Sequence, residues 1–240
     1  MDILQWKKEL TDKAQPERKA ILSSFFKTGK GQYGEGDVFI GLYVPDNRAI
    51  SKKYHKLPLE IIGELLKDKI HEFRLAALIA LVKKYSAQKD EQGRKDIMEF
   101  YLANTDRINN WDLVDLSCPQ IIGEWVMRSG NIQLLHNLSE SACLWRRRIA
   151  IVSTYTLIKN GVSSPTLAIA EKYLSAKEDL IHKATGWMLR EVGKADTNAL
   201  ISFLDRHAAH MPRTMLRYSL EKLPKETKMD YMKRKKSETL

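Results

Sequence analysis

One aspartate, Asp115, occupies an unusual place in the sequence for a charged residue. If a helix begins near Asn110, then Trp111, Val114 and Asp115 lie on one face of it, because they are spaced i, i+3 and i+4. The carboxylate then has apolar neighbours, where an ionised group needs either a partner or an open cleft. In a cleft, a fixed carboxylate can stabilise positive charge that develops on a reacting group.

A second charged residue, Arg148, has the same kind of placement. It shares a helix face with Leu144 and Ile151. An ion pair between Arg148 and Asp115 that ties adjacent elements together explains both placements without any chemistry, and this alternative stays open. Asp112 needs no such explanation, since a carboxylate is favoured in the first turn of a helix.

Trp187 is a third candidate. It follows Gly186, and glycine inside a helix usually marks the close approach of another group. The indole lies at the edge of an apolar stripe, on the side of Lys183 and Arg190. It can serve either as a packing residue or as a stacking platform for a ligand.

Composition limits the class of protein. Forty Lys and Arg residues against thirty Asp and Glu give a formal net charge of +10. This balance favours a polyanion partner, although a merely basic, solubilising surface would give the same count. Cys118 and Cys143 follow neither a metal-ligand spacing nor a disulfide framework, and the N-terminal segment carries charges where a signal peptide is apolar. We expect a cytoplasmic protein without membrane association, metal or other cofactor.

Helical periodicity runs through nearly the whole chain, and sustained strand-type alternation is hard to find. Similar segments surround Arg74, Arg148, Lys183 and Arg213, at intervals of 74, 35 and 30 residues, and the first interval divides into two steps of 37 at Trp111. This period is typical of helical-pair repeats. We predict an all-α, HEAT-like helical-repeat solenoid with a concave basic face, the alternative being an irregular helical bundle.

Two segments lie outside the repeats. Gly29, Gly31 and Gly34 match the letters of a nucleotide-binding fingerprint, but a helix-like segment precedes them and no βαβ unit is predicted. We therefore expect a glycine-rich loop over residues 29–45 and no nucleotide cofactor. The tail, residues 224–240, is basic with few apolar residues and is predicted to be frayed or disordered, which leaves a single domain over residues 1–223.

The stretches NNWDLVD, LWRRRIA and GWMLREVGK, in that order, together with GDVFIGLYVPDNR, resemble the AlkD family of bacterial DNA alkylation-repair glycosylases. The resemblance runs from about Phe25 to Leu223. It implies an enzyme that binds double-stranded DNA, as a monomer, and hydrolyses the N-glycosidic bond of cationic alkylated purines. By position, Asp115 corresponds to the catalytic aspartate, and Trp111 and Trp187 to the tryptophans of the cleft.

The same resemblance places Arg148 as the arginine of the cleft. Arg48, Arg190 and Arg213 are further candidates for contacts with DNA phosphates. No lysine is placed for an amine-based lyase step, so a monofunctional glycosylase is expected. Two alternatives remain: a catalytically inactive HEAT-like protein that recognises distorted or branched DNA, and a helical scaffold for other proteins.

Overall fold

The computed structural model describes residues 2–234. They fold into α-helices joined by turns, by short 3₁₀- and π-helical segments and by one long loop over residues 26–43. Within this range the sole β-type pairing is an isolated bridge between Val38 and Ile70. The all-α prediction is confirmed. Two compact units make up the chain, residues 1–121 and 122–240. The single domain over residues 1–223 stays a prediction, as does the concave basic face.

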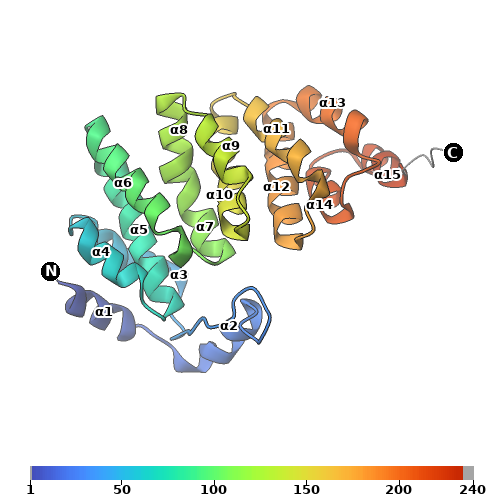
Figure 1. The fold of residues 1–240 in the computed structure, drawn as a ribbon. Coiled ribbons are helices and arrows are strands. Elements are labelled where there is room, and N and C mark those ends of the chain that lie inside the picture. Colours follow the sequence, from blue (N-terminus) through green and yellow to red (C-terminus); the bar gives the residue numbers. More distant parts are fainter. Residues whose placement is uncertain (1, 235–240) are drawn as a thin grey trace. The chain divides into compact units, whose positions relative to one another are not determined.

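The first unit is built around one long helix (Figure 1). Its helices are α1 (Ile3–Thr11), α2 (Lys19–Phe25), α3 (Val44–Ser51), α4 (Leu59–Leu66), α5 (His71–Ala87), α6 (Glu91–Ala103) and α7 (Trp111–Cys118). Apolar residues occur all round α5, which is typical of a helix surrounded by others. It packs against α3, α4, α6 and α7, and its central leucines, Leu75, Leu78 and Leu81, are buried.

A buried carboxylate, that of Glu72, anchors the loop between α2 and α3. Glu72, in the first turn of α5, accepts hydrogen bonds from the backbone N–H groups of Ile40, Gly41 and Leu42, the shortest being 2.8 Å from Gly41. Three donors on one carboxylate anchor the loop to the start of α5. Helix α2, not a strand, precedes the glycines, so the fold does not provide the context of a nucleotide-binding fingerprint.

Helix pairs repeat within the second unit. The helices are α8 (Glu124–Ser129), α9 (Gln133–Ser139), α10 (Leu144–Lys159), α11 (Ser164–Lys172), α12 (Asp179–Ala195), α13 (Thr197–His207), α14 (Arg213–Ser219) and α15 (Lys225–Lys233). The second helix of each pair packs on the second helix of the next: α10 on α12, and α12 on α14. The repeat anchors Arg148, Lys183 and Arg213 lie in the first two turns of these three helices. The helical-repeat prediction is therefore confirmed within this unit.

Gly186 explains how closely α12 and α14 pack. A Cβ atom at this position would lie 2.5 Å from the carbonyl oxygen of Met215 and 2.6 Å from Cβ of Tyr218. Real Cβ atoms do not approach other atoms so closely. The close approach that this glycine predicted is confirmed, and the group that approaches is the backbone of α14.

The expectation of a disordered tail is wrong for Lys225–Lys233, which form α15. Tyr231 is buried and donates a hydrogen bond of 2.8 Å to Asp205 on α13. These contacts with the preceding repeat order a segment whose composition alone favours disorder. The remainder of the predicted tail, residues 235–240, lies outside the described residues. No helix among residues 2–234 is both long and apolar enough to cross a membrane.

Candidate active site

Helix α7 carries two of the predicted site residues. It begins at Trp111, as the predicted start near Asn110 requires, and the Asn110 side chain accepts a hydrogen bond of 2.8 Å from the backbone N–H of Trp111. Asp115 follows one turn later on the same face. Both side chains are half-buried. The first unit therefore holds an indole and a carboxylate together, each in part open to solvent.

The ring of Trp111 packs against two aromatic side chains at the C-terminal end of α2. Phe26 stacks on it, with ring centroids 5.3 Å apart and planes at 19°. Phe25 meets the same ring edge-on at 5.8 Å and is 60% exposed. Phe26 also stacks on Phe39 and contacts His71, so the support is continuous with the core. The result is an open aromatic surface beside Trp111, and Phe25 belongs to it.

A buried network of charged side chains lies behind this surface. The two ring nitrogens of His71 contact two carboxylates: Nδ1 lies 3.0 Å from Asp37, and Nε2 lies 2.7 Å from Asp112. Arg74 donates a hydrogen bond of 2.5 Å to Asp37, and Asn110 donates one of 3.2 Å to the same carboxylate. Asp112 thus does more than occupy the first turn of α7, because its bond to His71 ties that turn to α5.

The protonation of His71 follows from its neighbours. Burial by itself lowers the pKa of the imidazole, but the charge of Asp112 and the hydrogen bonds to Asp112 and Asp37 outweigh burial and raise the pKa to about 9. For Asp37, burial raises the pKa, and the hydrogen bond from His71 with the charges of Arg74 and His71 brings it below its ordinary value. A charged imidazolium therefore bridges two carboxylates at neutral pH and fixes the start of α7.

The second unit holds Arg148 and Trp187, on the adjoining helices α10 and α12. Arg148 is buried, and its Nη1 donates a hydrogen bond of 2.6 Å to the carbonyl oxygen of Leu180 in the next repeat. Trp187 is half-buried, and its ring centroid lies 6.2 Å from that of Tyr155. Its Nε1 donates a hydrogen bond of 3.2 Å to Glu191. Both side chains are held in defined orientations.

Glu191 organises the cations around Trp187. Lys194 contacts both of its carboxylate oxygens, at 2.8 and 2.9 Å, and Arg190 contacts one at 3.1 Å. Burial raises the pKa of Glu191, but the hydrogen bonds from Lys194 and Arg190 outweigh burial and hold the pKa below its ordinary value. Arg190 also forms an ion pair with Glu221. The charge of Arg190, a predicted DNA contact, is therefore largely matched inside the protein.

The two remaining predicted contacts are both exposed. Arg48 lies on α3 in the first unit. Arg213 begins α14 in the second, where its Nη2 donates a hydrogen bond of 2.6 Å to the carbonyl oxygen of Met232 in α15. The structure thus places Trp111 and Asp115 on one face of α7, and Arg148 and Trp187 on the adjoining helices α10 and α12, while Arg48 and Arg213 lie on other helices. A role of these arginines in DNA binding stays a prediction.

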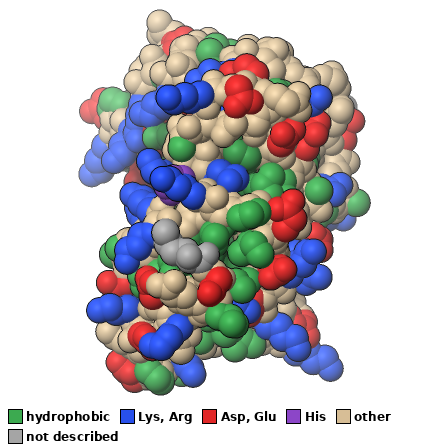
Figure 2. Space-filling view, turned by 90° about the vertical axis from the view of Figure 1, so that its left-hand side faces the viewer, with side chains coloured by type: hydrophobic (Ala, Val, Ile, Leu, Met, Phe, Trp, Pro, Cys, Tyr) green, Lys and Arg blue, Asp and Glu red, His purple; other side chains and the backbone are tan. Residues whose placement is uncertain are grey.

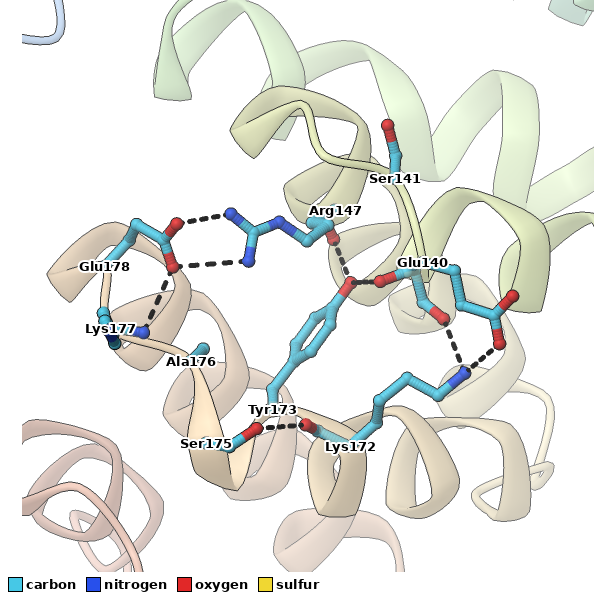
Figure 3. A pocket seen from close by; sticks show the side chains of 10 residues that line it. Glu140, Ser141, Arg147, Lys172, Tyr173, Ser175, Ala176, Lys177 and Glu178 are labelled. Atoms are coloured by element: carbon cyan, nitrogen blue, oxygen red, sulfur yellow. Dashed lines mark hydrogen bonds and ion pairs between the residues drawn. The ribbon is translucent and has the colours of Figure 1, made fainter.

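A pocket on the second unit is also lined by charged residues (Figure 3). Arg147 faces Glu178, at 2.5 Å, and Lys172 faces Glu140, at 2.7 Å. The hydroxyl of Tyr173 donates to the carbonyl oxygen of Arg147. Two of the three cations that line the pocket thus face a carboxylate, and the third, Lys177, forms no ion pair among the described residues, so only one unmatched charge is left to attract an anion. On the face drawn in Figure 2, Lys and Arg likewise lie among Asp and Glu, so the net charge does not by itself locate a binding surface.

Comparisons with known proteins agree on the class of protein. Residues 6–223 match the family of DNA alkylation repair enzymes. Among solved structures, the chain is similar to a predicted DNA alkylation repair enzyme from Enterococcus faecalis, with a TM-score of 0.70 over 89% of this chain and 98% of that chain. The two sequences are 18% identical, so this likeness shows the fold. A search of curated proteins found no match.

Proposed function

Because the chain belongs to the family of DNA alkylation repair enzymes, we propose that it is a DNA N-glycosylase that releases cationic alkylated purines from double-stranded DNA. The substrates are 7-alkylguanine and 3-alkyladenine. The observation that carries the proposal is the placement of Asp115: a half-buried carboxylate on α7, one turn after Trp111 and its open aromatic surface.

The reaction needs little acid catalysis. A purine alkylated at N3 or N7 already carries a positive charge, so it leaves the sugar as a neutral base without being protonated. Positive charge then develops at C1′ as the glycosidic bond breaks. Asp115 stabilises this oxocarbenium charge and orients the water molecule that attacks C1′.

One carboxylate can supply a large part of the rate. At a distance of about 4 Å and an effective dielectric constant of about 20, the interaction of Asp115 with the developing charge is worth about 4 kcal/mol. This corresponds to roughly a thousandfold in rate. Trp111 and Trp187 pack on the deoxyribose of the lesion, and each favours positive charge near its ring face by about 0.5 to 2 kcal/mol. Arg148 binds a phosphate beside the lesion, and Arg48, Arg190 and Arg213 bind further phosphates.

The test measures base release from DNA that contains 7-methylguanine. Asp115→Asn keeps the size of the side chain and removes its charge, so we expect release to slow by roughly a thousandfold. Asp106→Asn is the matched control, because it removes one exposed carboxylate from the same unit, and it should leave the rate unchanged. Equal rates for Asp115→Asn and the unaltered protein, or no release by either, would refute the proposal. Rapid release of the neutral base uracil would refute the mechanism.

A further inference from the structure

We propose that a groove in the first unit, formed by α3, α5 and the turn after α7, binds the sugar-phosphate backbone of DNA at undamaged nucleotides next to the lesion. The inference rests on the proposed function, which already gives Arg48 a phosphate, and adds to it the groove around Arg48 with two further cations, Lys52 and Lys83. Its cations are Arg48, Lys52 and Lys83. The groove has a volume of about 370 Å³.

Two helices present these cations to the same space. Arg48 and Lys52 are spaced i, i+4 and therefore lie on one face of the α3 segment. On α5, Lys83 shares a face with the buried Ile79, and Ser86 follows one turn later. All three cations are exposed. The groove thus combines an apolar floor with charged walls, which suits a deoxyribose on the floor and a phosphate between the walls.

The charge of this groove is unmatched, unlike the charge of Arg190 beside Trp187. Among the described residues, no acidic side chain forms an ion pair with Arg48, Lys52 or Lys83. In the second unit, by contrast, Arg190 pairs with Glu191 and Glu221. Three positive charges without an internal counterion repel one another, and an external polyanion relieves that repulsion and releases its own condensed counterions.

The groove also lies at a definite position along α7. Leu116, the residue after Asp115, lines it, and so does Gln120 in the π-helical turn Pro119–Gly123. Gln120 lies five positions after Asp115, which corresponds to about 7.5 Å along a helix axis. One DNA strand rises about 3.4 Å per nucleotide. For a DNA strand that runs along α7, we place the bound phosphate about two nucleotides from the sugar that faces Asp115.

The salt dependence of DNA binding tests this site. Each phosphate contact contributes about 0.9 to the slope of log affinity against log salt concentration. The groove holds one phosphate, so we expect Lys52→Gln/Lys83→Gln to lower the slope by about 0.9. The variant should therefore lose about eightfold more affinity for an undamaged duplex at about 0.1 M salt than at about 1 M. Lys52→Arg/Lys83→Arg keeps both charges and should keep the slope.

Lys8→Gln/Lys95→Gln is the matched control, because both lysines are exposed and pair with an acid one turn away, Asp12 and Glu99. It also removes two positive charges, and it should leave the slope unchanged. If Lys52→Gln/Lys83→Gln has the same slope as the control, the groove does not bind DNA and the inference is overturned.

A separate measurement of base release distinguishes a failure of the groove proposal from a failure of the proposed glycosylase function. If the slope is unchanged and 7-methylguanine is released normally, the groove does not bind DNA and the proposed glycosylase activity is retained. If the slope of the variant is lowered but the unaltered protein releases no base, the groove binds DNA and the proposed glycosylase activity is refuted. Replacing single phosphates by neutral methylphosphonates locates the contact. Sensitivity about two nucleotides from the lesion that is lost in Lys52→Gln/Lys83→Gln supports the stated position.

Discussion

The buried imidazolium of His71 makes the stability of the first unit depend on pH. Its pKa is about 9 in the folded protein and 6.5 as an ordinary histidine. A raised pKa in the folded state means that folding favours the protonated form. The stabilisation is therefore complete below pH 6.5 and is lost as the pH rises through about 9. With about 1.4 kcal/mol for each pH unit between these values, the loss amounts to about 3 kcal/mol.

Urea unfolding followed by circular dichroism, repeated across this pH range, measures the loss directly. His71→Gln isolates the contribution of one residue. It leaves the carboxylates of Asp37 and Asp112 without the cation between them, so we expect it to destabilise the protein by about 3 kcal/mol or more below neutral pH. The difference from the unaltered protein should shrink as the pH approaches and passes 9, because the imidazole then loses its own charge.

His55→Gln is the control, since the imidazole of His55 bonds to the backbone carbonyl of Lys52 in its own turn and lies outside the network. It should leave the pH dependence as it is. A constant difference between His71→Gln and the unaltered protein from slightly acid to strongly alkaline pH would show that His71 is neutral in the folded state. The account of the network as an imidazolium between two carboxylates would then be wrong.

Two further predictions concern the second unit. Gly186→Ala places a methyl group against the carbonyl oxygen of Met215 and the side chain of Tyr218, so we expect a loss of about 1 to 3 kcal/mol in the free energy of unfolding, seen as a lower melting temperature. An unchanged melting temperature would mean that α14 shifts without cost. Glu191→Gln removes a buried charge that accepts from Trp187 and two cations, so we expect a loss of about 1 to 3 kcal/mol near neutral pH. Because the pKa of Glu191 is lowered, this difference should shrink on acidification below the ordinary value of 4.5, and a difference that is unchanged in acid would contradict the assignment.

Local features of the fold could be predicted from the sequence because they depend on neighbours along the chain. The spacing of Trp111 and Asp115 placed them on one helix face, and the helix does begin at Trp111. Gly186 indicated a close approach, which α14 makes. Arg148 indicated a need for a partner, and one of its partners is the carbonyl oxygen of Leu180.

Features that depend on which distant segments meet could not be predicted in this way. Phe25 and Phe26 reach Trp111 from the far side of the glycine-rich loop, and no spacing in the sequence points to that contact. His71 precedes an apolar helix and gave no sign that two carboxylates enclose it. The order of α15 has the same origin, because contacts with the preceding repeat, such as that of Tyr231, outweigh the polar composition of the segment.

The network around Asp37 has a consequence for the order in which the first unit folds. The hydrogen bond from Asn110 to Asp37 joins residues 73 positions apart, and that from Arg74 spans 37. Closing such loops costs entropy before the contact repays it, so we expect α5 and its leucine contacts to form early and this network to form late. During synthesis, the aromatic surface beside Trp111 cannot be complete until α7 has left the ribosome. We therefore expect the candidate active site to be among the last parts of this unit to assemble.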